Sequence, residues 1–161
     1  MRLAIVVLED EPEVREAIER DLEIFADVVR IEPAEDVPDA RELLAEIEAD
    51  GDLLALVLAD HRLPGESGVD FLVELASSAD HGSVRTVLVT GQAGLEDTVR
   101  AVNEAGLDHY IAKPWSAAEL VETVRNQLTE FVLAADLDPL PHLRALDGPR
   151  VMEIVRRRLD R

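Results

Sequence analysis

Three carboxylates, a hydroxyl and one ammonium group are the side chains of this chain that could do chemistry together. Glu9 and Asp10 follow a first apolar run, whereas Asp60, Thr90 and Lys113 stand at the ends of later runs. Carboxylates that are brought together repel one another and resist full ionisation. A hard divalent cation relieves this repulsion, and oxygen ligands with room for water suit Mg²⁺. The set therefore predicts a magnesium site.

Lys113 is the only lysine among 16 basic residues, and all the others are arginine. A lysine offers a compact point charge on a flexible stem, which suits contact with a phosphoryl oxygen. Each residue also has an ordinary explanation on its own. Glu9 and Asp10 could favour a helix start through their charge, Thr90 could belong to a turn, and Lys113 could be surface charge. Their joint placement at strand ends favours a shared site.

The segment Leu53–Ala59 is an unbroken apolar run that ends on Asp60. Such a run is typical of a central strand that is buried on both faces of a parallel sheet. Open α/β sheets bind ligands outside the carboxyl ends of their strands, where Asp60 would lie. The alternative is that Asp60 only caps a turn.

Apolar runs and amphipathic stretches alternate five times along the chain, which predicts five βα units and a doubly wound parallel sheet with helices on both faces. Ser116 and Glu119 form a capping box, and Leu95, Val99 and Val102 recur at helical spacing. The expected strands are Leu3–Leu8, Asp27–Glu32, Leu53–Ala59, Val84–Val89 and Asp108–Ala112. The first expected helix begins at Pro12. The other expected helices span Val37–Ala49, Val69–Ser77, 92–105 and 116–131.

Composition limits the function classes. The 161 residues suit one domain with an appendage, and the absence of cysteine excludes disulfides, thiolate zinc sites and thiol catalysis. No long apolar span or signal segment is present, so we expect a cytoplasmic protein without a membrane partner. The net charge of −19 opposes direct binding of nucleic acid, and residues 1–135 hold 30 of the 35 acidic residues.

The set Glu9-Asp10, Asp60 with Leu63-Pro64-Gly65, Thr90 and Lys113-Pro114 resembles the receiver domain of two-component response regulators, as in chemotaxis regulators. The similarity runs from Arg2 to Phe131. It implies a flavodoxin-like fold and a phosphorylation-dependent signalling switch in which Asp60 accepts a phosphoryl group from a histidine kinase or phosphotransfer protein. It also implies that Glu9, Asp10, Asp60 and the backbone carbonyl of Arg62 hold Mg²⁺, while Thr90 and Lys113 bind phosphoryl oxygens.

The resemblance further implies a switch in which Thr90 moves toward the phosphoryl group and Tyr110 rotates inward. The responsive surface would then be residues 92–131, through which a homodimer or an output domain could be bound. Arg62 and Gln92 match positions that tune the lifetime of the phosphoryl group. Glu9 stands where aspartate is more common, and Lys113-Pro114 is a candidate for a cis peptide bond.

Two other classes compete with this hypothesis. A receiver fold could serve as a protein-interaction module that phosphorylation does not control, although the intact acidic set argues against it. A Mg²⁺-dependent phosphatase would need an Asp-x-Asp pair on the first strand, which Leu8-Glu9-Asp10-Glu11 lacks. We therefore expect no classical enzyme, only self-phosphorylation from phosphodonors and slow autodephosphorylation.

We expect the receiver to span 1–134 and a C-terminal extension or linker to span 135–161. Val151–Leu159 is too short for a stable lone helix, so it should dock on its own domain or on a second chain. Arg156–Arg158 is too small a basic run to indicate nucleic-acid binding. The extension either completes a stand-alone receiver or leads to an output domain.

Overall fold

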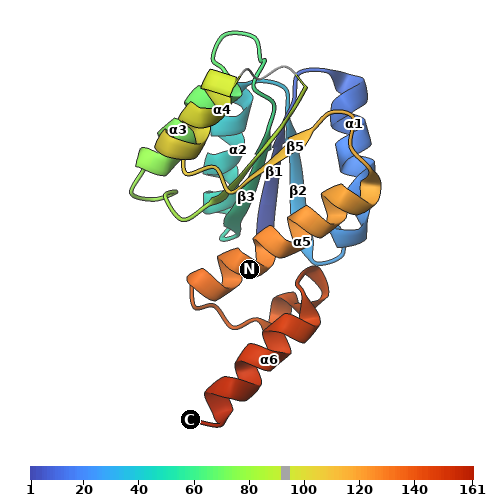
Figure 1. Cartoon of the computed structure of the whole chain (residues 1–161), viewed down its shortest axis with the longest axis vertical. Coiled ribbons are helices and arrows are strands. Elements are labelled where there is room, and N and C mark those ends of the chain that lie inside the picture. The colour runs from blue at the N-terminus through green and yellow to red at the C-terminus, as the bar shows by residue number, and fades with distance from the viewer. Residues whose placement is uncertain (92–94) are drawn as a thin grey trace.

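The structure is a computed structural model that describes residues 1–91 and 95–161 (Figure 1). Five parallel strands form one sheet in the order β2-β1-β3-β4-β5. The strands are β1 (Leu3–Leu8), β2 (Val29–Ala34), β3 (Leu53–Ala59), β4 (Arg85–Thr90) and β5 (His109–Ala112). The helices are α1 (Pro12–Asp21), α2 (Val37–Ala49), α3 (Gly68–Ser77), α4 (Leu95–Glu104), α5 (Ala117–Ala134) and α6 (Gly148–Leu159), with short 3₁₀ helices η1 (Glu23–Phe25) and η2 (Leu140–Ala145).

Helices cover both faces of the sheet, as predicted. One apolar core joins α1 and α5 to the sheet through Ile18, Leu22, Leu120 and Val124. The other core joins α2, α3 and α4 to the sheet, and Ala101 is the buried residue that α4 contributes to it. The prediction of a doubly wound parallel sheet is confirmed.

The sequence sets several helix starts through side-chain caps. Asp36 Oδ1 accepts from the Asp39 amide at 2.8 Å at the start of α2, and Ser67 Oγ accepts from the Asp70 amide at 3.0 Å at the start of α3. Ser116 Oγ accepts from the Glu119 amide at 3.1 Å, where the capping pattern predicted it. Each bond satisfies an amide that has no partner within its helix.

Several element boundaries differ from the prediction. β4 and β5 each begin one residue later than predicted, at Arg85 and His109, and β4 ends at Thr90 rather than Val89. The differences at β2 and α5 are larger. β2 begins at Val29 rather than Asp27, because Asp27 and Val28 belong to the turn after η1 and the pairing with β1 starts at Val29. The strand continues through Pro33, which an edge strand tolerates. α5 continues three residues beyond Phe131, to Ala134.

The C-terminal segment packs on α5. Val151 is fully buried in the same core as Phe131, and the Asp147 amide donates to Thr129 Oγ1 at 2.9 Å. Arg125 of α5 donates to the carbonyl of Leu146 at 3.3 Å. Of the two expected docking sites, the start of this segment occupies the one on its own domain, whereas Leu159 at its end is exposed. Within residues 1–91 and 95–161, no helix combines the length and the hydropathy needed to cross a bilayer.

Candidate functional site

The predicted site residues meet at the carboxyl edge of the sheet. Glu9 and Asp10 follow β1, Asp60 follows β3, Thr90 ends β4 and Lys113 follows β5. Backbone hydrogen bonds fix the two central loops: the Asp60 amide donates to the Leu8 carbonyl at 3.0 Å, and the Glu9 amide donates to the Ala34 carbonyl at 3.0 Å. The sheet therefore determines where the two buried carboxylates stand.

Lys113 bridges the two buried carboxylates. Its Nζ lies 2.6 Å from Glu9 Oε1 and 2.8 Å from Asp60 Oδ2. The side chain of Glu9 is 1% exposed and that of Asp60 is 7% exposed. The sequence predicted that Mg²⁺ relieves the repulsion among the carboxylates. In the structure the ammonium group of Lys113 already offsets the repulsion between Glu9 and Asp60.

This arrangement separates the pKa values of the two carboxyl groups. Burial raises the pKa of Glu9 to about 7, and Asp60 adds to the rise, although the hydrogen bond from Lys113 opposes it. Burial would also raise the pKa of Asp60, but hydrogen bonds with Lys113, Glu9 and Thr90 hold that pKa below its usual value. Burial would lower the pKa of Lys113, but its bonds to Asp60 and Glu9 raise it. Asp60 is therefore the ionised member of the pair.

The acidic set fits a divalent cation. Glu9, Asp10 and Asp60 can each offer an oxygen atom such that all three lie within 4.8 Å of one another. Glu9 Oε2 is buried and has no hydrogen-bond partner in the part of the chain that the structure describes. A buried oxygen atom that accepts no hydrogen bond lowers the stability of the fold unless a cation or a water molecule contacts it. Carboxylate oxygens with an exposed side suit Mg²⁺.

An open cavity of about 660 Å³ gives access to this set. Asp10, Asp60 and Lys113 line it together with Arg62 and Trp115. The Arg62 amide donates to Asp60 Oδ1 at 3.3 Å, which places the chain after Asp60 against the carboxylate.

The remaining predicted residues lie on β4 and β5. Thr90 is fully buried at the end of β4, and its side chain contributes to the low pKa of Asp60. The Tyr110 hydroxyl donates to the Thr90 carbonyl at 3.0 Å, so this aromatic ring already points toward β4. Gln92 lies outside the described residues.

Three contacts that support the site were not predicted from the sequence. Arg15 of α1 donates to the Glu9 carbonyl at 2.9 Å, and the Trp115 indole donates to Asp21 Oδ2 at 2.9 Å. These bonds tie the loops after β1 and β5 to the same helix. Gly68 packs its Cα against the Asp60 backbone, where a Cβ atom would meet the Asp60 carbonyl oxygen at 1.8 Å. Of these contacts, the only signal in the sequence is the glycine that follows the capping Ser67.

Gly68→Ala is expected to displace Asp60 and to lower stability. The added methyl group overlaps backbone atoms, which cannot rotate away, so a loss of about 1–3 kcal/mol in the free energy of unfolding is expected. Urea unfolding measures this loss. Gly148→Ala is the matched control, because a Cβ there meets no atom within 4 Å. Equal stability of the two variants would contradict the close packing at Asp60.

Comparison with known proteins decides the family. Residues 5–125 match the model of the response regulator receiver domain. The chain belongs to the response regulator receiver family. This receiver is 27% identical to a CheY-like response regulator receiver domain protein from Methanospirillum hungatei, with a TM-score of 0.70 over 83% of this chain and 99% of that one.

Curated relatives are longer regulators. The receiver is 31% identical over 136 residues to the hydrogenase transcriptional regulatory protein HoxA of Cupriavidus necator, and the match covers 84% of this chain and 26% of HoxA. It is 32% identical over 166 residues to the phosphate regulon transcriptional regulatory protein PhoB of Escherichia coli, and covers 96% of this chain and 68% of PhoB. The chain thus spans about a quarter of HoxA.

The raised pKa of Glu9 predicts a pH dependence of stability for this receiver. The pKa of Glu9 is about 7 in the folded chain, against an ordinary value of 4.5. Between pH 4.5 and pH 7, Glu9 therefore binds more protons in the folded chain than in the unfolded chain. In the absence of Mg²⁺, the part of the free energy of unfolding due to Glu9 is expected to fall by about 1–3 kcal/mol as pH rises from about 5 to 8. Glu9→Gln should remove this part, as measured by urea unfolding at each pH.

Glu11→Gln is the control for this pH dependence, because Glu11 is a nearby glutamate that is exposed rather than buried. Mg²⁺ binding needs an ionised Glu9, so the affinity of the wild type for Mg²⁺ should weaken as pH falls below about 7. A pH profile shared by the wild type and Glu9→Gln would show that Glu9 titrates outside this range.

Proposed function

We propose that the chain accepts a phosphoryl group on Asp60 and acts as a phosphorylation-dependent signalling switch. The observation that carries this proposal is an ionised carboxylate, held by Lys113 at 2.8 Å, which faces an open cavity beside two further carboxylates. The donor is a phosphohistidine of a histidine kinase or phosphotransfer protein, as is usual for the family. A small-molecule phosphodonor with a good leaving group would serve the same site.

Asp60 is the nucleophile of the transfer. One of its carboxylate oxygens attacks phosphorus, the bond from phosphorus to the donor nitrogen breaks, and the donor imidazole keeps the bonding electrons and takes up a proton. The resulting acyl phosphate carries more negative charge than the carboxylate did. Lys113 can move its Nζ from Asp60 Oδ2 to a phosphoryl oxygen, which offsets this charge.

Glu9, Asp10 and Asp60 would hold Mg²⁺, with the backbone carbonyl of Arg62 as a further ligand. When bound, the ion supplies positive charge that lowers the repulsion between Asp60 and an incoming phosphoryl group. Glu9 Oε2, which has no partner among the described residues, supports this set. Slow hydrolysis of the acyl phosphate would return the site to its starting state, at a rate tuned by Arg62 and Gln92.

The switch would act through Thr90 and Tyr110. The Tyr110 hydroxyl bonds the Thr90 carbonyl at 3.0 Å, so a movement of Thr90 toward a phosphoryl group would change the contacts of β5. The neighbouring α4 exposes Val99 and Val102, at 47% and 52%. This apolar surface supports a role of residues 92–131 in binding an output domain or a second copy.

The fluorescence of Trp115 tests the proposed function. Trp115 is the only tryptophan and lines the same cavity as Asp10, Asp60 and Lys113. Titration with Mg²⁺ should give a saturable change, and beryllofluoride, whose fluorides stand in for phosphoryl oxygens on Asp60, should give a second change that requires Mg²⁺. Asp10→Asn should weaken the first response, because a charged ligand becomes a neutral amide.

Two outcomes would speak against this proposal. The first is a fluorescence curve with NaCl, at matched ionic strength, that equals the Mg²⁺ curve. Such a result would mean that Mg²⁺ acts only by general screening of a chain with a net charge of −19. A module that phosphorylation does not control should show no response to beryllofluoride. A response to Mg²⁺ without one to beryllofluoride would keep the metal site and remove the phosphoryl switch.

A further inference from the structure

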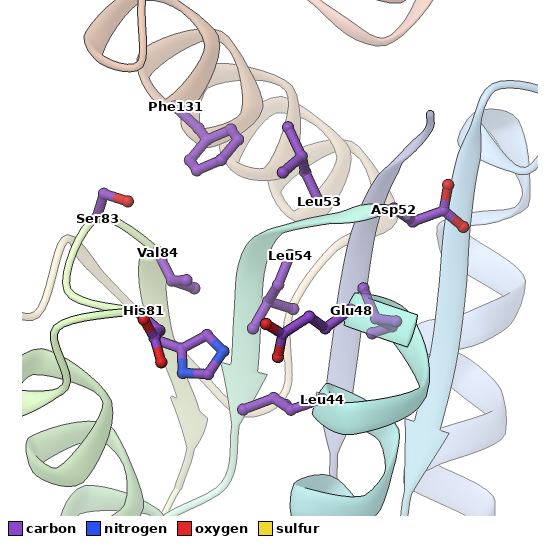
Figure 2. A pocket seen from close by; sticks show the side chains of 11 residues that line it. Leu44, Glu48, Asp52, Leu53, Leu54, His81, Ser83, Val84 and Phe131 are labelled. Atoms are coloured by element: carbon purple, nitrogen blue, oxygen red, sulfur yellow. The ribbon is translucent and has the colours of Figure 1, made fainter. Parts of the chain in front are cut away.

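A groove lies between α2 and α3 at the amino end of the sheet, on the edge opposite to the acidic site. It joins two cavities of about 200 and 330 Å³ that share Leu44, Glu48 and His81. Figure 2 shows that side chains from α2, β3, α5 and the segment before β4 surround the first cavity. Its main apolar side chains are Leu44, Leu54, Phe131 and Val84. We call the joined space the α2–α3 groove.

The rim of the α2–α3 groove is acidic. Glu48 and Asp80 are exposed, and neither side chain forms an ion pair with any residue in 1–91 or 95–161. Arg41 is the nearby cation, but it is already paired with Glu66 and Glu74, each at 2.8 Å. An apolar space with free carboxylates at its rim suits a segment that carries apolar and cationic side chains together.

The last turn of α6 has this chemistry. Val151 is fully buried on the domain and Val155 packs against the same core, but Leu159, one turn further along the stripe, is 81% exposed. Met152 on the same helix is 42% exposed. The apolar stripe of α6 therefore begins on its own domain and ends in solvent.

The same turn carries three consecutive arginines. Arg157 pairs with Glu153 at 2.6 Å and Arg158 pairs with Asp136 at 3.3 Å, and all four side chains are more than half exposed. Arg156 forms no ion pair within the described part of the chain. Exposed pairs of this kind are weak and exchange readily for others. The end of α6 can therefore offer its charges to another acidic surface.

The end of α6 and the groove lie at the same end of the molecule. Figure 1 shows α6 leaving the body on the side of the N-terminus, which is the amino end of β1. The start of α6 is fixed to its own α5, through the Asp147 amide on Thr129 at 2.9 Å and the ion pair of Arg150 with Glu130. This attachment directs the last turn of α6 away from its own domain.

We propose that the last turn of α6 binds the α2–α3 groove of a second copy of this chain, so that two copies exchange these helix ends. Leu159 meets the apolar wall around Leu44, and Arg156 meets Glu48 at the rim. A twofold axis makes the exchange reciprocal, so each dimer contains the contact twice and leaves no open end. The dimer does not depend on phosphorylation of Asp60.

Sedimentation equilibrium of the full chain without Mg²⁺ or phosphodonor tests the exchange. The wild type should show a concentration-dependent dimer. Glu48→Arg and Arg156→Glu should each weaken it about tenfold, because each change replaces attraction by repulsion at two symmetric contacts. Both positions are exposed, so both variants should fold. Glu46→Arg is the matched control on α2, since Glu46 does not line the groove, and it should dimerise as the wild type does.

An equimolar mixture of the Glu48→Arg and Arg156→Glu variants provides the decisive arm. In a mixed dimer, the altered groove meets the altered helix and the unaltered groove meets the unaltered helix, so dimers should return. A wild type that stays monomeric at every concentration, or a mixture that stays monomeric, would overturn the proposal. A dimer that Glu48→Arg leaves unchanged would do so as well. Asp60→Asn should dimerise normally, which separates this result from the proposed function.

Discussion

Asp60→Asn is expected to take up no phosphoryl group from acetyl phosphate and Mg²⁺, whereas the wild type takes up one. The amide has the size of the carboxylate but lacks its charge and nucleophilicity. The rate of transfer should therefore fall by about a thousandfold or more. Intact-protein mass spectrometry measures the added phosphoryl group.

Asp80→Asn is the matched control for this loss, because Asp80 is exposed and makes no ion pair in the described part of the chain. It should be phosphorylated as the wild type is. If Asp60→Asn gained the same mass at the same rate, the acceptor would be another residue. The Asp60 variant should also stay folded, because the shape of the side chain is kept. Lys113 also keeps its other ion pair, with Glu9 at 2.6 Å.

Lys113→Ala is expected to change both stability and chemistry. It leaves Glu9 and Asp60, at 1% and 7% exposure, without their shared cation. Removal of one partner from a buried ion pair costs about 3 kcal/mol, so the free energy of unfolding without Mg²⁺ should fall by about this amount. Mg²⁺ should recover most of the loss, because it supplies charge to the same carboxylates. Phosphorylation should stay slow even with Mg²⁺.

Lys113→Arg keeps the charge and separates the two effects. Without Mg²⁺ it should be more stable than Lys113→Ala. It should nevertheless be phosphorylated slowly, because the planar guanidinium cannot take the place of a compact ammonium group at the phosphoryl oxygens. Urea unfolding with and without Mg²⁺ gives the stabilities. A Lys113→Ala variant as stable as the wild type without Mg²⁺ would show that the two carboxylates do not need this counter-ion.

The buried parts of the fold follow from the sequence. β1 and β3 have the predicted bounds because each is an unbroken apolar run that the sheet buries on both faces. β2 is displaced by two residues because it is an edge strand with partly exposed residues, so its apolar pattern is weaker. Val99 and Val102 recur at helical spacing but are exposed, because Ala101 and Ala105 face the sheet instead.

The site was predictable as far as strand ends determine it. Asp60 and Lys113 follow recognisable strands, so their meeting follows from the topology of a parallel sheet. The bridge from Lys113 to Glu9 was not predictable, because it depends on the depth and direction of two side chains. The resemblance to receiver domains implied contacts of Lys113 with phosphoryl oxygens only. The clash distance at Gly68 and the bond from Trp115 to Asp21 likewise exist only in three dimensions.

Reductive trapping of the phosphorylated wild type tests the central claim most directly. Borohydride converts an acyl phosphate on aspartate to homoserine, and peptide mass spectrometry then locates the modified position. The reaction should be run with a phosphohistidine donor and Mg²⁺, and with the donor alone. We expect modification at Asp60 only, dependent on Mg²⁺ and absent from unphosphorylated chain. Modification at another residue, or none at Asp60 while the donor loses its phosphoryl group, would contradict the assignment of Asp60 as the acceptor.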